Sequence, residues 1–280
     1  MYSRVYVEIT NICNKNCSFC PKNKRKPTFM SVDQFEMVTD KLLPLTKYIY
    51  LHVMGEPLLH PHVADFVKIA TAKGLKCAIT TNATLLSDKG DAIIDAGVYK
   101  VNISLHSFED ADELSHRRYV ETCADFADKA SKAGVLCVFR LWNGGTEVNN
   151  NEATLNILKE KFPHDWANGT RGARIRDKLH IEFADEFSWP DKNADYIGER
   201  VFCYGLKDHF GILSDGSVIP CCLDHDGDMT LGNAFEGDIS EILGSGMALS
   251  IKEGFEKRMA ITEMCRRCGY ARRFSQKNGI

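Results

Sequence analysis

The sequence predicts an α/β protein built on a parallel sheet, followed by a smaller cysteine-rich segment. Strand-like runs that are mainly apolar alternate with helix-like segments along most of the chain, which is typical of a parallel sheet buried on both faces. From Cys203 onward this alternation stops and cysteines become frequent. We therefore expect a large domain at residues 1–200 and a small domain at residues 201–280.

Runs of β-branched and aromatic residues mark the strands, while capping residues, Gly and Pro mark the helix ends. Ser31, for example, is the expected N-cap of a helix that ends near Pro44. Residues 163–178, rich in Gly, Asn and Arg, are predicted to form a mobile loop. The predicted strands are residues 5–9, 48–54, 76–80, 99–105, 135–141, 179–183, 210–213 and 218–220, and the predicted helices are residues 31–43, 62–73, 87–96, 121–133, 150–161 and a segment from about 239.

Composition limits the function classes. The chain has 280 residues, 44% of them hydrophobic, which is enough for a sizeable core. Its formal net charge of -3 gives no indication of nucleic-acid or membrane binding. The first residues contain no apolar signal core, so we expect a cytoplasmic protein. In a reducing compartment, eleven cysteines indicate metal or redox sites rather than disulfides.

The strongest signal is the segment Cys13-Asn14-Lys15-Asn16-Cys17-Ser18-Phe19-Cys20. Three thiolates on one short loop can bind three of the four irons of a cubic iron-sulfur cluster. Such a cluster normally has four cysteine ligands. The remaining iron is then open to a small molecule, as in catalytic metal sites. A structural zinc site or an electron-carrying cluster is the alternative, although zinc usually takes its ligands from paired motifs.

This CxxxCxxC loop, with the aromatic residue Phe19 before its last cysteine, resembles that of the radical S-adenosylmethionine (SAM) superfamily. The resemblance implies a partial (β/α)6 barrel, a 4Fe-4S cluster held by Cys13, Cys17 and Cys20, and SAM on its open iron beside Phe19. In parallel barrels the chemistry gathers at the carboxyl ends of the strands. Polar residues at those ends are therefore the candidates for SAM binding.

Two strand ends resemble SAM-binding motifs of the superfamily. Gly55-Glu56-Pro57 is similar to its GGEP motif, with Met54 in place of the first glycine. By this likeness, the Glu56 carboxylate receives the ammonium group of SAM. Asn82 lies in a segment where the family often has Thr-Asn-Gly, and Ala83 at the glycine position is unfavourable for a tight turn.

Further candidates end the later strands. Ser104 and His106 fall where relatives place polar groups on the ribose or carboxylate of SAM, and Arg140 falls where some relatives have an arginine for that carboxylate. A satisfied polar pair at the rim is the alternative for His106 and Arg140. Candidates for orienting substrate or accepting a proton are the carboxylates at the end of the sixth strand, with surface solvation as the alternative: Glu182, Asp185 and Glu186.

Four carboxyl-terminal cysteines can close a second metal site. They are Cys203, one of Cys221 and Cys222, Cys265 and Cys268. Adjacent residues of an extended segment point to opposite sides, so one of Cys221 and Cys222 is expected to be a ligand. This part resembles the SPASM and twitch extensions of radical SAM enzymes, which hold auxiliary 4Fe-4S clusters. The cysteine number favours the twitch form with one cluster, and similarity to twitch-bearing 2-deoxy-scyllo-inosamine dehydrogenases favours Cys221. Zinc is the alternative occupant.

The resemblance implies an enzyme that reductively cleaves SAM to a 5'-deoxyadenosyl radical and abstracts hydrogen from a substrate, in a net oxidation assisted by the auxiliary cluster. It also implies a low-potential electron donor of the flavodoxin or ferredoxin type. Oxidation of a small molecule is favoured weakly, because only twelve residues precede Cys13; a peptide- or protein-modifying maturase is the alternative. A non-catalytic iron-sulfur carrier or metal-binding scaffold is a hypothesis of another class, for which a barrel around a pocket is unnecessary.

Overall fold

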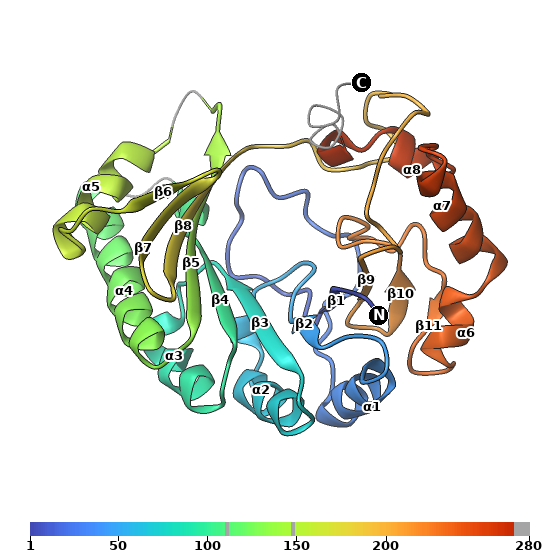
Figure 1. Cartoon of the computed structure of the whole chain (residues 1–280), viewed down its shortest axis with the longest axis horizontal. Coiled ribbons are helices and arrows are strands. Elements are labelled where there is room, and N and C mark those ends of the chain that lie inside the picture. Colours follow the sequence, from blue (N-terminus) through green and yellow to red (C-terminus); the bar gives the residue numbers. More distant parts are fainter. Residues whose placement is uncertain (110–111, 147–148, 272–280) are drawn as a thin grey trace.

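The computed structural model describes residues 1–109, 112–146 and 149–271. Within these ranges the strands form one 11-stranded sheet in the order β11-β10-β9-β1-β2-β3-β4-β5-β8-β7-β6. Figure 1 shows the sheet curving into a partial barrel, with helices α1 to α5 along its outer side and helices α6 to α8 near its other end. The predicted α/β fold is confirmed.

The barrel is built from parallel strands joined by outer helices. The parallel strands are β1 (Arg4–Val7), β2 (Tyr48–Tyr50), β3 (Lys76–Thr81), β4 (Lys100–Ser104), β5 (Leu136–Gly144) and β8 (Leu179–Asp185). The helices are α1 (Val32–Leu42), α2 (Val63–Ala72), α3 (Leu86–Asp95), α4 (Glu113–Lys132) and α5 (Asn151–Lys161), and short 3-10 turns follow β2 (η1, Pro57–Leu59) and β4 (η2, Leu105–Ser107).

The core lies between the sheet and the outer helices. On β1, Val5 and Val7 are fully buried in this core. Arg4 and Tyr6, at the alternate positions, line a cavity inside the barrel instead. Because successive side chains of a strand point to opposite faces, β1 divides its residues between core and cavity.

Capping explains where several helices begin. Ser31 and Gln34 form the capping box of α1, as the sequence predicts. Helix α4 begins well before the predicted residue 121, because Asp112 accepts a hydrogen bond from the amide of Ser115. The predicted helix near residue 239 is divided into α6 (Ile239–Leu243) and α7 (Gly246–Glu256), since Ser245 caps a new helix.

The prediction of a loop at residues 163–178 is wrong. This segment contains the hairpin of β6 (Ala167–Gly169) and β7 (Gly172–Arg176), and β7 extends the sheet by pairing antiparallel with β8. A Cβ atom on Gly172 would lie 1.9 Å from the carbonyl oxygen of Ile181. The glycine that suggests a loop therefore permits close strand pairing.

The carboxyl-terminal part joins the same sheet. Strand β9 (His209–Ile212) is parallel to β1, and β10 (Ser217–Ile219) and β11 (Gly232–Asn233) follow antiparallel. The short helix α8 (Glu263–Arg266) and the 3-10 turn η3 (Gly269–Ala271) complete the described chain. Because β9 pairs directly with β1, the domain boundary after residue 200 stays a prediction.

In the part of the chain that the structure describes, no helix is long and apolar enough to cross a membrane. The cytoplasmic location stays a prediction.

The turn after β2 packs tightly against the loop after β1. Gly55 has a φ of +76°, and a Cβ atom there would lie 2.4 Å from the carbonyl oxygen of Thr10. The next residue, Glu56, donates its amide to the carbonyl oxygen of Ile12 at 2.8 Å. Only glycine combines this backbone conformation with this close approach.

Replacing Gly55 with Ala should therefore destabilise the protein by about 2–5 kcal/mol, because left-handed strain adds to a backbone clash. Urea unfolding under anaerobic conditions measures the loss. The matched control is Gly74→Ala, since Gly74 has a φ of +80° but a Cβ atom there would meet nothing within 4 Å. Equal losses in the two variants would show that the close contact at Gly55 contributes nothing.

Candidate active site

The loop that carries Cys13, Cys17 and Cys20 is fixed by side chains on both of its flanks. Ser18 donates its amide and its hydroxyl to the carboxylate of Glu109 at 2.8 and 2.7 Å. Lys22 donates to the carbonyl oxygen of Cys17 at 2.7 Å. These contacts hold the cysteine loop against the segment that follows β4.

Glu56 lies buried beneath the cysteine loop. Its carboxylate accepts hydrogen bonds from the amides of Leu58 and Asn82 and from the hydroxyl of Thr81, at 2.9, 2.6 and 2.7 Å. Burial nevertheless raises the pKa of Glu56 to about 7. The side-chain amide of Asn82 in turn lies 3.8 Å from the sulfur of Cys13. Two predicted SAM-binding residues thus lie directly beside the cysteine loop.

The turn that carries Asn82 forms despite the alanine that follows it. Ala83 adopts a φ of +66°, and its amide donates to the Thr81 hydroxyl at 2.9 Å. The hydroxyl of Tyr119 donates to the carbonyl oxygens of Asn82 and Ser104, at 2.9 and 3.3 Å. These bonds offset the strain of a left-handed non-glycine residue.

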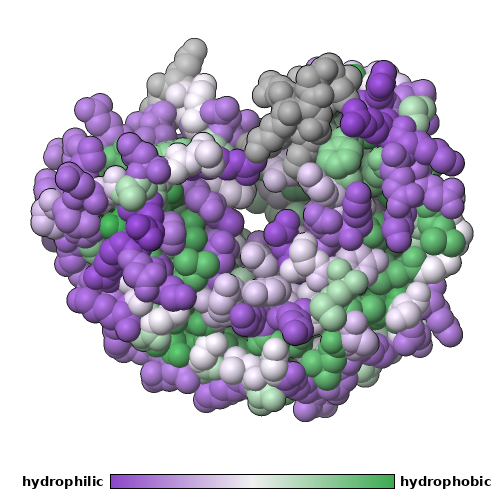
Figure 2. Space-filling view, in the orientation of Figure 1, coloured by the Kyte–Doolittle hydropathy of each residue, from purple (hydrophilic) through white to green (hydrophobic). Residues whose placement is uncertain are grey.

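A cavity of about 480 Å³ lies inside the barrel, and we call it the first cavity. Its wall includes the other four predicted SAM-binding residues: Phe19, Ser104, His106 and Arg140. Figure 2 shows the molecule hollowed near its centre. The rings of Phe19 and His106 lie 4.9 Å apart, and Nδ1 of His106 lies 3.0 Å from the carbonyl oxygen of Arg140. Burial lowers the pKa of His106, which favours the neutral ring.

The carboxylates at the end of β8 lie in different surroundings. Glu182 forms an ion pair with Arg140 at 3.7 Å and lines a second cavity, between β5, β7 and β8, rather than the first. Asp185 is exposed beside Gly144. Glu186 lines the first cavity. The structure therefore brings Glu186 to the first cavity, whereas Glu182 is connected to that cavity through its ion pair with Arg140.

The carboxyl-terminal cysteines Cys203, Cys221, Cys265 and Cys268 gather at the first cavity. Burial, with further contributions from the thiols of Cys203, Cys222, Cys265 and Cys268, raises the pKa of Cys221 well above its usual value. Cys222 also lines this cavity, but it packs against a separate apolar cluster beside Tyr6. This arrangement supports Cys221 as the ligand, and the assignment stays a prediction.

The spacing of the thiols bears on which metal fits them. In the described ranges, no group of three or more Cys, His, Asp or Glu side chains is arranged to hold a metal ion. A tetrahedral zinc with bonds of about 2.3 Å would bring its sulfurs to within about 4 Å of one another. In the described structure, neither cysteine set is therefore arranged as a single tetrahedral zinc ion would require.

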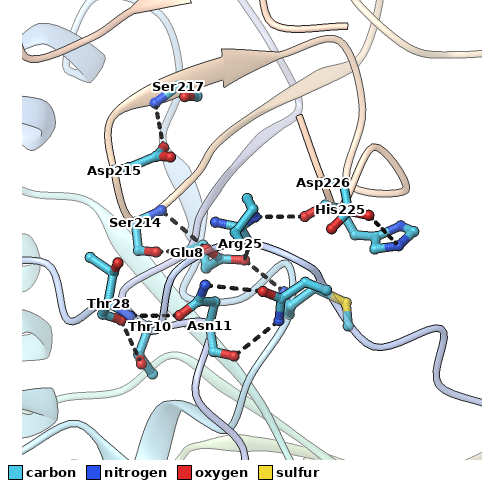
Figure 3. Close-up of polar contacts among 12 residues, drawn as sticks. Glu8, Thr10, Asn11, Arg25, Thr28, Ser214, Asp215, Ser217, His225 and Asp226 are labelled. Atoms are coloured by element: carbon cyan, nitrogen blue, oxygen red, sulfur yellow. Dashed lines mark hydrogen bonds and ion pairs between the residues drawn. The ribbon is translucent and has the colours of Figure 1, made fainter. Parts of the chain in front are cut away.

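A buried carboxylate that the sequence reasoning missed connects the site to the rest of the fold. Glu8 follows β1 and is fully buried; it accepts hydrogen bonds from Arg25 at 2.7 Å and from the amide of Met54 at 3.0 Å. It also accepts from the amide and hydroxyl of Ser214, at 3.1 and 2.9 Å. Figure 3 shows these partners converging from separate segments. A charged residue within the apolar run at residues 5–9 was the signal that could have revealed it.

The sequence reasoning also missed most of the cavity wall. Strands β1, β2 and β9 contribute five lining residues to the first cavity. These are Arg4 and Tyr6 on β1, Tyr50 on β2 with His52 just after it, and His209 on β9. The residues on β1 and β2 alternate with buried apolar residues. This alternation was visible, but it does not by itself tell which face encloses a cavity.

Comparison with known proteins identifies the class to which this fold and site belong. Residues 7–158 match the family described as the Radical SAM superfamily, and residues 203–269 match SPASM, described as an iron-sulfur cluster-binding domain. The chain is 34% identical over 279 residues to a GTP 3',8-cyclase of Chlorobaculum tepidum, covering 85% of this chain and 83% of that protein. The chain belongs to the radical SAM superfamily and is an enzyme with a carboxyl-terminal SPASM domain.

Other relatives match over shorter lengths. A GTP 3',8-cyclase of Aliarcobacter butzleri is 30% identical over 139 residues, which is 46% of this chain and 43% of that protein. The chain therefore spans less than half the length of that relative in the alignment.

Solved structures share the fold at low identity. BtrN in complex with AdoMet and 2-DOIA has a TM-score of 0.60 and 18% identity, covering 96% of this chain and 93% of BtrN. Streptococcus suis SuiB bound to S-adenosylmethionine has a TM-score of 0.66 and 15% identity, covering 99% of this chain and 75% of SuiB. The two family domains imply a SAM-binding 4Fe-4S cluster and an auxiliary iron-sulfur cluster as cofactors.

Replacing Glu8 with Gln should destabilise the protein by about 3–5 kcal/mol, because the side chain of Arg25 would keep a buried charge without its partner. Anaerobic urea unfolding measures this loss. Asp91→Asn is the control: Asp91 pairs with Lys129 on the surface, so its loss should cost less than about 1 kcal/mol. Similar costs for the two variants would contradict a central role for Glu8.

Replacing Cys221 with Ala should lower the iron content of the reconstituted protein by about four atoms, the content of one cube. Cys222→Ala, its adjacent control, should keep the iron, because Cys222 packs toward Tyr6. Iron and sulfide are counted after anaerobic reconstitution. Loss of iron only in Cys222→Ala would reverse the ligand assignment.

Proposed function

We propose that this chain is a SAM-dependent oxidoreductase that oxidises a small substrate in the first cavity. One observation carries the proposal: a single cavity is lined by Phe19 of the cysteine loop and by the thiols of the carboxyl-terminal site. When bound, the cluster on the cysteine loop would supply one electron that cleaves SAM into methionine and a 5'-deoxyadenosyl radical. That radical would take a hydrogen atom from the substrate, and the substrate radical would then lose a proton and pass its second electron to the auxiliary cluster. We propose Cys13, Cys17 and Cys20 as its ligands, and Cys203, Cys221, Cys265 and Cys268 for the auxiliary cluster.

The buried carboxylate of Glu56 is the proposed partner of the SAM ammonium group. Its three hydrogen bonds come from neutral donors, and burial still raises its pKa to about 7. An ammonium group beside it would favour the ionised form. Asn82 would orient this end of SAM next to Cys13.

The remaining SAM contacts are proposed on the wall of the first cavity. Phe19 and His106 offer adjacent ring surfaces for the adenosyl group, and Ser104 lies on the same wall. Arg140 offers a guanidinium group to a carboxylate. We propose Glu182 and Asp185 as orienting or proton-accepting groups; Glu182 acts through its ion pair with Arg140.

The walls of the cavity suit radical chemistry on a small substrate. Trp142, Trp189 and Tyr204 are among the aromatic side chains that line it, and such walls exclude water from a reactive intermediate. A volume of about 480 Å³ lies in the usual range for small-molecule sites, and it also admits a single side chain of a peptide. The electron donor we propose is a flavodoxin or ferredoxin.

Anaerobically reconstituted protein should convert SAM to 5'-deoxyadenosine when dithionite is supplied, because the cluster on the cysteine loop has an open iron. The Cys13→Ala, Cys17→Ala, Cys20→Ala triple variant should lose this activity and fall from about eight to about four irons. Liquid chromatography of the nucleoside and iron counting give the two measurements.

Cys77→Ala is the matched control, since Cys77 is buried in the core on β3 and should affect neither measurement. Absence of 5'-deoxyadenosine from fully loaded wild-type protein would contradict the proposed SAM cleavage and substrate oxidation. A non-catalytic iron-sulfur carrier would then be the better description.

A second candidate is the reaction named for the relatives, conversion of GTP. The 34% identity to the Chlorobaculum tepidum protein across most of both chains favours it. The same assay with added GTP separates the two candidates. Consumption of GTP coupled to 5'-deoxyadenosine formation would replace substrate oxidation as the proposed reaction.

A further inference from the structure

The first cavity contains a concentration of buried polar atoms without partners. In the described part of the chain, eight buried side-chain nitrogen or oxygen atoms make no hydrogen bond, and four of them belong to residues that line this cavity. Buried polar groups are normally hydrogen-bonded, so a group of this kind marks a place for a ligand or ordered water. The four atoms are Nε of Arg4, Nδ1 of His52, Nε of Arg140 and Nδ1 of His209.

These four residues surround one pair of tyrosines. The ring of Tyr6 lies 5.5 Å from that of Tyr50, 5.5 Å from that of His52 and 5.7 Å from that of His209. Arg4 lies 5.9 Å over the ring of Tyr50. Arg140 interacts electrostatically with both tyrosines, as Arg4 does. The two guanidinium groups therefore converge on the same place from β1 and β5.

In the described chain, neither Arg4 nor Arg140 has a carboxylate within hydrogen-bond distance. Arg4 forms no ion pair with any carboxylate in the described ranges, and Arg140 has only the 3.7 Å pair with Glu182, whose side chain is 39% exposed. Arg171 adds a third guanidinium to the cavity wall, where Asp208 and Glu186 are the carboxylates. Arg140 is only 14% exposed and Arg4 is half-buried, and a cation removed from water in this way is normally paired more closely than either of them is.

The two histidines are suited to add hydrogen bonds without adding charge. Burial, with the Arg140 guanidinium beside it, lowers the pKa of His52 to about 3. Burial, with Arg4 beside it, lowers the pKa of His209 to about 4. Each ring is therefore neutral near pH 7 and can donate or accept one hydrogen bond toward a ligand.

We propose that the first cavity recognises a substrate bearing a carboxylate or phosphate group, with Arg4 and Arg140 as its ion-pair partners and His52 and His209 beside them. Arg140 is then assigned to the anion of the substrate in place of the carboxylate of SAM. This inference rests on the proposed function, because it names the substrate class of the same cavity. Acetate and inorganic phosphate represent the two sources of the anion. Acetamide has the shape of acetate without its charge.

Arginine footprinting tests the proposal on the reconstituted, full-length protein. Phenylglyoxal modifies arginines, and peptide mass spectrometry gives a modification rate at each one. Acetate or phosphate should slow modification of Arg4 and Arg140 about tenfold at about ten times its dissociation constant. Acetamide should not, and the exposed Arg118 on α4 should react at the same rate throughout. Equal protection by acetamide, or no protection by either anion, would overturn the proposal.

Variants link the protection to Arg4 itself. Arg4→Gln should weaken anion protection of Arg140 about 10- to 100-fold, because one charged hydrogen-bonding partner is lost. Arg118→Gln is the matched control, and Arg4→Lys should restore part of the effect while keeping the charge if the Gln variant folds poorly. Full protection of Arg140 in a folded Arg4→Gln variant would remove Arg4 from the site.

Two further measurements distinguish a failure of the proposed anion site from a failure of the proposed function. SAM carries a carboxylate of its own; if SAM alone protects both arginines, the anion is that of the cofactor and the substrate proposal fails. Formation of 5'-deoxyadenosine is measured in the same preparations. Normal SAM cleavage without anion protection overturns the anion site alone, while anion protection without SAM cleavage contradicts only the proposed function.

Discussion

The buried carboxylate of Glu8 is the interaction on which the arrangement of the site depends. It accepts hydrogen bonds from the cysteine loop through Arg25, from the turn after β2 through Met54, and from the turn after β9 through Ser214. With the hydroxyl of Ser214, Glu8 has four donors. No apolar residue could satisfy them in a buried place, and leaving them unsatisfied would cost several kcal/mol, about 1–3 kcal/mol for each group. One side chain thus fixes three loops that approach the barrel from different parts of the chain.

This fixation has a functional consequence, because the loops that meet at Glu8 carry or adjoin the chemistry. The cysteine loop begins shortly after Glu8, and the turn that holds Met54 continues into Glu56, which bonds to Asn82 beside Cys13. Ser214 lies between β9 and β10, and Cys221 and Cys222 follow β10. The direct pairing of β9 with β1 connects the strand before the cysteine loop to the hairpin that precedes Cys221.

Local sequence patterns predicted much of this structure, whereas contacts between distant parts of the chain were not predicted. The cysteine spacing, the Ser31 cap and the alternation of strands and helices are readable within a few residues, so the fold was predictable. The hairpin at residues 167–176 was missed because Gly and Asn indicate loops until a partner strand is known. Arg4 and His209 were missed as cavity residues because their meeting depends on the pairing of β1 with β9, and Glu8 because its partners lie far along the chain.

Strand β1 shows how few residues set the whole site. Arg4 on this strand brings a cation to the first cavity, and Tyr6 forms part of its aromatic wall. Glu8, which follows the strand on the same side, binds Arg25, whereas Val5 and Val7 fill the core. A slip of one residue in the pairing with β2 or β9 would send all three polar groups into the apolar core. The burial of two valines, of about 1.5–3 kcal/mol each, opposes that slip on this strand alone. The register that stabilises the barrel is therefore the same register that positions its chemistry.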